Sequence, residues 1–235
     1  LPIFVVRSVS TVVRDVLLGG SAGLMLGATV FSLVLPGFET AVAQTGSDKL
    51  ASLLIGGGMM VGAFLLWVID RLVPHEHLCK GKSPEEQDRI KGVWLFVLAI
   101  TIHNFPEGLA VGVGFGGGNV GNGLALTTAI FVQNLPEGFA VALAMLTVKH
   151  TALGATGIAL GTGVVETIGG FVGASIVSLS AILLPVALAV AAGAMLFVIS
   201  HEVIPETHRN GHETPATFGV VAGFVVMMFL DVALV

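Results

Sequence analysis

The chain has 235 residues, of which 54% are hydrophobic and only 11% are charged, and its formal net charge at pH 7 is −5. Soluble domains carry about 25% charged residues, so this composition excludes an ordinary soluble globular protein and indicates lipid as the solvent. The single cysteine, Cys79, excludes a disulfide framework and a thiolate-rich metal site. We therefore predict an all-α fold, a polytopic transmembrane helical bundle embedded in a lipid bilayer.

Seven apolar stretches are long enough to cross the roughly 30 Å hydrocarbon core of a bilayer, which takes about 20 helical residues. Residues 1–12 are apolar but short, so we predict a connector there. Polar or Gly/Pro-marked segments separate the spans, and we treat residues 1–235 as a single transmembrane domain with a loop at 71–91. The predicted spans lie at residues 15–36, 50–70, 92–115, 121–147, 152–178, 183–204 and 215–235.

The basic residues test this arrangement. With seven alternating spans, all of the 10 Lys and Arg residues except Lys49 fall on the same side of the membrane. Basic residues mark the cytoplasmic side of membrane proteins. The bias therefore predicts that the 71–91 loop is cytoplasmic and that residue 235 lies on the side of the membrane opposite the cytoplasm. In a bacterium, the membrane that borders the cytoplasm is the inner membrane.

The third and fourth spans contain the same polar motif. Residues 103–111 read HNFPEGLAV, and residues 133–141 read QNLPEGFAV. Because adjacent spans run in opposite directions, the two copies form an inverted pair, which is typical of transporters with a binding site near the bilayer midplane. Pro106 and Pro136 each remove a backbone hydrogen bond and predict a kink in their helix.

Helical spacing places the polar side chains of each copy on one face. His103, Asn104 and Glu107 share a face of the third span because they are three or four residues apart. The corresponding residues of the fourth span are Gln133, Asn134 and Glu137.

Glu166 of the fifth span is a further intramembrane acid. A charged side chain at the bilayer centre costs roughly 2.5–3.5 kcal/mol, and no Lys or Arg lies within these spans. Either the carboxyl groups are protonated and merely stabilise two proline kinks, or they bind a cation. Carboxylate, imidazole and amide groups together suit a divalent metal ion. Clustered carboxylates would suit two adjacent ions bridged by Glu107 and Glu137.

At these motifs the sequence resembles the ZIP (Zrt/Irt-like) metal transporter family, particularly its bacterial members. Residues 165–167 match the position of the family's additional intramembrane carboxylate, and residues 201–206, HEVIPE, are similar to its signature in the penultimate helix. The resemblance covers nearly the whole chain. Since the family has eight spans, we expect its first helix to be absent from this sequence, which begins at Leu1.

The resemblance implies a secondary transporter that imports divalent metal ions into the cytoplasm, with Zn²⁺ as the main substrate and Cd²⁺, Fe²⁺ and Mn²⁺ as further candidates. It also implies a binuclear site and alternating access by an elevator-like motion between two helix bundles. Met25 sits where a thioether could join the first metal position, although packing is the ordinary role of a membrane methionine. The first position is expected to use His103, Gln133, Glu107 and Glu137. The second is expected to use Asn104, Asn134, Glu107, Glu137 and Glu166.

Further polar residues lie outside the motif pair. His201 and Glu202 could be exit-path metal ligands or an interfacial polar cap. His75 and His77 open the long cytoplasmic loop and could collect metal that leaves the pore. Asp231 in the last span is a functional candidate because acids inside a membrane are rare.

Two other functions use the same residues, a metal-selective channel and a membrane di-metal enzyme. Carboxylates and His at helical spacing occur in di-iron bundles, but no Ser or Cys nucleophile lies near the motif, and we predict that the chain is not an enzyme. Tight binding by several carboxylates favours alternating access over a conducting pore. We expect no nucleic-acid partner, and the sequence leaves the oligomeric state open, a homodimer included.

Overall fold

The computed structural model describes residues 10–72, 84–116, 118, 120–179 and 181–234, which form helices and no strand. Seven helical segments in this part of the chain are long and apolar enough to cross a membrane. The prediction of an all-α polytopic membrane protein with seven spans is therefore confirmed.

The first span is a continuous rod of three elements, namely α1 (Thr11–Ala28), the π-helix η2 (Thr29–Val34) and α2 (Leu35–Thr45). The next four spans are α3 (Asp48–Leu72), α4 (Pro84–Gly116), α5 (Val120–Thr147) and α6 (Ala152–Leu179). The sixth span begins after the 3₁₀ turn η3 (Ala181–Leu183) and consists of α7 (Leu184–Val198), the π-helix η4 (Ile199–Val203) and α8 (Ile204–His208). The last span is α9 (Glu213–Leu234).

Each π-helix precedes a proline. Pro36 and Pro205 lie in the first turns of α2 and α8. Proline lacks an N–H and its ring clashes with the carbonyl four residues earlier, and the wider π turn accommodates both effects. The helices therefore continue past these prolines, so two predicted boundaries are wrong: the first span runs to Thr45 instead of residue 36, and the sixth runs to His208 instead of residue 204.

The predicted 71–91 loop is also shorter than expected. α3 extends to Leu72 and α4 begins at Pro84, so both ends of that segment are helical. His75 and His77 lie outside the described residues.

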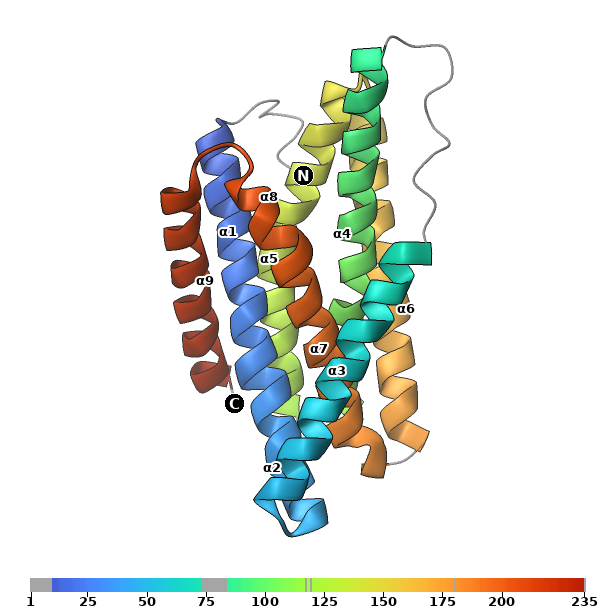
Figure 1. Cartoon of the computed structure of the whole chain (residues 1–235), viewed down its shortest axis with the longest axis vertical. Coiled ribbons are helices and arrows are strands. Elements are labelled where there is room, and N and C mark those ends of the chain that lie inside the picture. Colours follow the sequence, from blue (N-terminus) through green and yellow to red (C-terminus); the bar gives the residue numbers. More distant parts are fainter. Residues whose placement is uncertain (1–9, 73–83, 117, 119, 180, 235) are drawn as a thin grey trace.

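Three pairs of helices pack closely: α1 lies against α9, α3 against α7, and α4 against α6 (Figure 1). Glycines allow backbone contact in each pair. A Cβ atom on Gly23 of α1 would overlap the carbonyl oxygen of Val220, and one on Gly112 of α4 would overlap that of Gly170; Gly62 of α3 packs on α7 in the same way. Lipid tails are as apolar as the side chains, so the hydrophobic effect does not hold membrane helices together. Close packing of their backbones does so instead.

α5 packs differently, since it contacts α1, α4, α6 and α9 and belongs to none of the three pairs. One polar contact ties it to α1: the hydroxyl of Ser21, which is buried, donates a 3.3 Å hydrogen bond to the backbone carbonyl of Gln133. The largest apolar core lies beside this contact and includes Met25, Leu126 and Met195, all fully buried. α5 is thus surrounded by helices from all sides of the described bundle except the α3–α7 pair.

Candidate metal site

The two copies of the motif meet inside the helical bundle. Glu107 of α4 is fully buried, and the equally buried Gln133 of α5 donates a hydrogen bond from Nε2 to Glu107 Oε1. Glu137 is buried one helical turn further along α5. Both glutamates therefore point into the protein and away from lipid.

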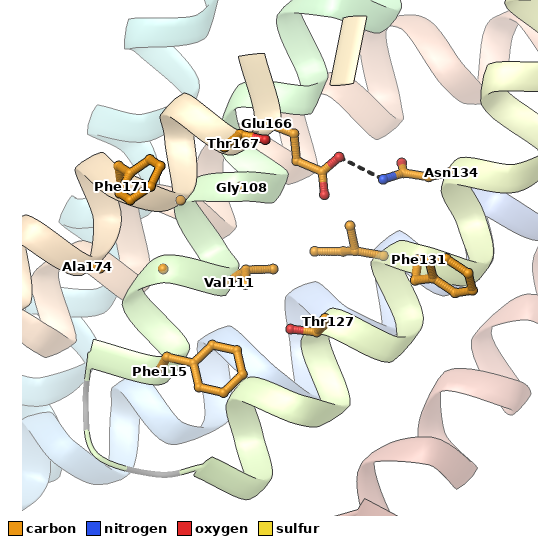
Figure 2. Close-up of a pocket in the computed structure, with 13 residues that line it drawn as sticks. Gly108, Val111, Phe115, Thr127, Phe131, Asn134, Glu166, Thr167, Phe171 and Ala174 are labelled. Carbon is orange, nitrogen blue, oxygen red and sulfur yellow. Dashed lines mark hydrogen bonds between the residues drawn. The ribbon is translucent and has the colours of Figure 1, made fainter. Parts of the chain in front are cut away.

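The third carboxylate comes from α6. Asn134 Nδ2 donates a hydrogen bond to Glu166 Oε2 at 2.8 Å (Figure 2). Because Gln133 and Asn134 are neighbours in the sequence, this part of α5 connects a carboxylate on α4 with a carboxylate on α6. Three helices, including both copies of the motif, contribute to one site.

Two cavities flank the Asn134–Glu166 hydrogen bond along the contact between α5 and α6. The larger cavity, of about 580 Å³, is lined mainly by apolar side chains and extends from Glu166 and Asn134 toward Phe115 (Figure 2). The smaller one, of about 220 Å³, is lined by Asn104 and Glu137 as well as by Asn134 and Glu166. The smaller cavity thus gathers oxygen-bearing side chains from both copies of the motif around open space.

Several acceptor oxygens at this site are unsatisfied. Asn104 Oδ1, Glu107 Oε2 and Gln133 Oε1 are buried and have no hydrogen-bond partner among the described residues. A buried polar atom without a partner costs about 1–3 kcal/mol, and oxygen acceptors are suitable ligands for a divalent cation. Within the described part of the chain, no three His, Cys, Asp or Glu side chains form a ready metal cluster; amide groups contact the carboxylates instead.

The other predicted ligands make no described polar contact with this site, or their side chains lie outside the described part of the chain. His103 belongs to α4 and Glu202 to η4, but their side chains are not among those described. Met25 is packed in the apolar core. His201 is exposed, stacks on Phe197 with ring centroids 5.0 Å apart, and lines a separate cavity of about 750 Å³ between α3 and α7.

Sequence reasoning missed two polar residues of α1 and left one acid unexplained. Ser21 reaches α5, as described above, and Asp15 is fully buried although it lies at the edge of an apolar run beside Arg14. Asp231 of α9 accepts a 2.9 Å hydrogen bond from Ser32 of η2, so it links the first and last spans. An acid or hydroxyl inside an apolar run was the available signal, but its partners lie far away in the sequence.

The sequence also matches a known protein family. The model of the ZIP zinc transporter family matches residues 74–231, which include both copies of the motif. The chain belongs to the ZIP zinc transporter family. The resemblance predicted from the paired N-x-P-E-G motifs is therefore confirmed.

Individual ZIP proteins match almost the whole chain. It is 48% identical to the zinc transporter ZIPB of Bordetella bronchiseptica over 228 residues, which are 97% of this chain and 74% of that protein. It is 43% identical to the zinc transporter GufA of Myxococcus xanthus over 234 residues, covering 100% and 92% of the two chains. The human zinc transporter ZIP11 is 31% identical over an alignment of 313 positions, which covers 99% of this chain and 92% of that protein. Membership in this family identifies a multi-pass membrane transporter and confirms that the chain is not an enzyme.

Proposed function

We propose that the chain is a secondary transporter that imports Zn²⁺ into the cytoplasm through a site built on Glu107, Glu137 and Glu166. The observation that carries this proposal is Glu107. Its carboxyl group is fully buried in a membrane-spanning helix, its hydrogen-bond donor is an amide, and no Lys or Arg occurs between residues 92 and 148. A buried acid in this setting is costly, and a passing cation would supply the missing positive charge.

The identity of the ion follows from the relatives. Those from Bordetella bronchiseptica, Myxococcus xanthus and Homo sapiens are all named zinc transporters. The oxygen-rich ligand set also suits the harder ions Fe²⁺ and Mn²⁺, whereas the softer Cd²⁺ is a candidate because it shares the charge and closed d shell of Zn²⁺. We therefore propose Zn²⁺ as the main substrate and Cd²⁺, Fe²⁺ and Mn²⁺ as further substrates.

We propose two adjacent ion positions that share Glu107 and Glu137. Gln133 contacts Glu107 and Asn134 contacts Glu166, so consecutive residues of α5 serve two different carboxylates. To bind metal, each amide must turn so that its oxygen and not its NH₂ group faces the ion. The first position would be completed by His103 and Gln133, with Met25 as a further candidate if the core repacks. The second would be completed by Asn104, Asn134 and Glu166.

Alternating access is supported by the way the helices are paired. Gly108 of α4 packs directly on the backbone of Glu166 in α6, so we expect the two helices that carry Glu107 and Glu166 to move as one unit. α5 joins that unit through side-chain hydrogen bonds. The α1–α9 and α3–α7 pairs would form the second body, against which the site-bearing helices move.

We further propose that residues 1–235 act as one transport domain in a bacterial inner membrane, with segment 71–91 on the cytoplasmic side. His201 and Glu202, followed by His75 and His77, would then receive ions that leave the site. The exposure of His201 in the span that ends at His208 is compatible with this role.

The proposal is tested by metal uptake into proteoliposomes that contain the purified protein. We expect saturable, ATP-independent Zn²⁺ uptake that is lost in Glu107→Ala and in Glu137→Ala. Asp48→Asn, which changes an exposed acid at the start of α3, is the matched control and should transport normally. Unchanged uptake in either glutamate variant would overturn the proposed site.

The number of ions is tested separately by measuring metal bound to the purified protein. We expect two Zn²⁺ ions per chain in the unmodified protein and one in Glu166→Ala, since Glu166 belongs only to the second position. A stoichiometry of one in the unmodified protein would overturn the binuclear site while leaving the transport function intact.

A further inference from the structure

A groove between α3 and α7 lies outside the metal site. Its volume is about 750 Å³, and its walls are mainly apolar, with Met60 and Ala63 from α3 and Leu196 and Phe197 from α7. No residue of either N-x-P-E-G motif is among the described residues that line it. Because both helices cross the membrane, such walls suit a hydrocarbon chain better than water.

Two polar side chains interrupt the apolar wall. Ser200 and His201 line the groove, are exposed, and form no hydrogen bond with any described residue. A polar group without a partner is costly inside a bilayer. The hydroxyl group and the imidazole ring can each donate a hydrogen bond. The occupant of the groove should therefore carry an acceptor oxygen at this level.

The polar pair lies at one end of the groove. α3 and α7 belong to the second and sixth spans, so they cross the membrane in the same direction (Figure 1). Gly56 and Gly193 line the part of the groove nearer the beginnings of these helices, and Ala63 and His201 line the part nearer their ends. In the proposed orientation of the transporter, the polar end of the groove faces the cytoplasm.

An arginine lies beyond the same end of the groove. The face of α3 that lines the groove contains Gly56, Met60 and Ala63. Trp67 and Arg71 continue this face, because each follows the previous member by four residues. The guanidinium carbon of Arg71 lies 5.7 Å from the centre of the Trp67 ring, which is a cation–π contact. Arg71 is exposed and forms no ion pair with a described acid.

The spacing along α3 fits a membrane lipid. Met60 and Arg71 are 11 residues apart in one helix. At 1.5 Å per residue this is about 16 Å, close to the roughly 15 Å depth of one hydrocarbon leaflet. A lipid with its headgroup at Arg71 would therefore place an acyl chain along the groove.

We propose that this groove binds one anionic phospholipid of the cytoplasmic leaflet. The phosphate pairs with Arg71, an ester carbonyl accepts hydrogen bonds from Ser200 and His201, and an acyl chain fills the apolar part. Arg71 selects an anionic headgroup because no described acid neutralises it, and basic sites between transmembrane helices on the cytoplasmic side bind such headgroups. The leaflet rests on the proposed orientation, whereas the site itself does not. Since His201 is also a proposed exit ligand, lipid and Zn²⁺ would compete for its imidazole.

Trp67 reports directly on the proposed site. The chain has 2 tryptophans, so Trp94→Phe leaves Trp67 as the single indole fluorophore. The full chain is reconstituted into vesicles of phosphatidylcholine and phosphatidylglycerol, in which one of the two lipids carries brominated acyl chains that quench Trp67 on contact. We expect a preference of about fivefold for phosphatidylglycerol, which corresponds to an attraction of about 1 kcal/mol per basic residue near the membrane surface.

Two arginine variants in the Trp94→Phe background test the headgroup contact. Arg71→Gln should abolish the preference for phosphatidylglycerol. Arg209→Gln is the control, because this exposed guanidinium pairs with Glu206 at 3.3 Å and does not line the groove, and it should keep the preference. Equal quenching by both lipids before the arginines are changed, or an unchanged preference in Arg71→Gln, would overturn the proposal. Shielding of Trp67 from both lipids would also overturn it, since a second copy of the chain would then cover the groove.

Two neighbouring glycines test the acyl-chain groove. Gly56 lines the groove, Gly57 is not among the described lining residues, and a Cβ atom on either would meet nothing within 4 Å. Gly56→Leu therefore fills the groove, whereas Gly57→Leu adds the same side chain outside it. Native mass spectrometry of the full chain in detergent, with phosphatidylglycerol added, should show one retained lipid in the unmodified protein and in Gly57→Leu, and none in Gly56→Leu.

The outcomes separate lipid binding from transport. Equal lipid retention by the two leucine variants would overturn the groove as the binding site. If Gly56→Leu does not fold, the quenching measurement on Arg71→Gln still decides. Neither experiment measures uptake, so absence of Zn²⁺ transport would refute the proposed function and leave the lipid site to be judged by quenching and retention.

Discussion

The two copies of the N-x-P-E-G motif have nearly the same sequence and different surroundings. In α4, Gly108 packs on the backbone of Glu166, whereas the equivalent Gly138 of α5 has open space where its Cβ would lie. Asn134 of α5 binds Glu166, whereas the Oδ1 atom of Asn104 has no partner among the described residues. The α4 copy is therefore packed on the α6 backbone, and the α5 copy contacts the glutamates of α4 and α6 through side-chain hydrogen bonds, which an arriving metal ion would replace in the proposed mechanism.

The largest effect on Zn²⁺ uptake is expected at the glutamate that each copy of the motif contains, Glu107 in α4 and Glu137 in α5. Glu107→Gln and Glu137→Gln keep the shape of the side chain and remove its charge. Even residues that only support a metal ligand change metal affinity by roughly 10–100-fold, so each variant should lose at least about 100-fold in Zn²⁺ uptake. Stability should not fall, because burying an amide costs less than burying a carboxylate.

The check is to measure uptake and thermal unfolding on the same preparations. Glu39→Gln, an exposed acid of α2, serves as the control. If one glutamine variant transported normally and the other did not, the two copies would differ in function as well as in packing.

The second prediction compares the stability effects of substituting the equivalent glycines of the two copies, Gly108 and Gly138. In Gly108→Ala the added methyl group would overlap the α6 backbone, and overpacking of this kind costs about 1–3 kcal/mol or more. Gly138→Ala should be tolerated, because the methyl group enters the smaller cavity. Thermal unfolding in detergent compares the two, and equal losses of stability would show that α5 is as tightly packed as α4.

The third prediction concerns the asparagines. Asn134→Ala removes a hydrogen bond to a carboxylate and should destabilise the protein by about 1–3 kcal/mol, whereas Asn104→Ala removes an unsatisfied acceptor and should be nearly neutral. Both variants should nevertheless lose the second Zn²⁺ ion. Thermal unfolding and bound-metal measurements on the two variants check this prediction. Equal stabilities, or loss of the second Zn²⁺ ion in only one variant, would contradict it.

The smallest effect is expected at Ser21, which contacts the backbone of the α5 copy. Interhelical hydrogen bonds in membranes are worth about 0.6 kcal/mol on average, a factor of about 3 in an equilibrium. Ser21→Ala should therefore change the uptake rate by no more than about threefold. Ser52→Ala is the control, since its hydroxyl donates to the Asp48 carbonyl within α3. A tenfold change at Ser21 would show that this contact governs the motion of α5.

Much of the fold could be predicted because lipid imposes simple rules. A helix that crosses hydrocarbon must be long and apolar, so the seven spans were readable from the sequence. The errors lay beside Pro36 and Pro205, where the predicted spans ended at residues 36 and 204. The π-helices η2 and η4 carry the chain past both prolines, and a π turn leaves no mark in composition.

The candidate site was predictable to a similar degree. Glu107, Glu137 and Glu166 were identifiable as candidates because each is an acid in an apolar span without a basic neighbour; the structure buries the first two, and their metal-binding role stays a prediction. The pairing of Asp15 was not predictable, since its partners Asn210 and His212 are about 200 residues away in the sequence and only the fold brings them together.

The sequence by itself therefore determined the membrane class, the number of spans and the chemical groups placed inside the bilayer, because hydropathy and charge act residue by residue. Only the tertiary structure decided how the two copies of the motif differ. Whether Gly108 or Gly138 contacts a neighbouring backbone, and whether Asn104 or Asn134 reaches Glu166, depends on which helix lies opposite, and packing between distant segments is a property of the folded molecule.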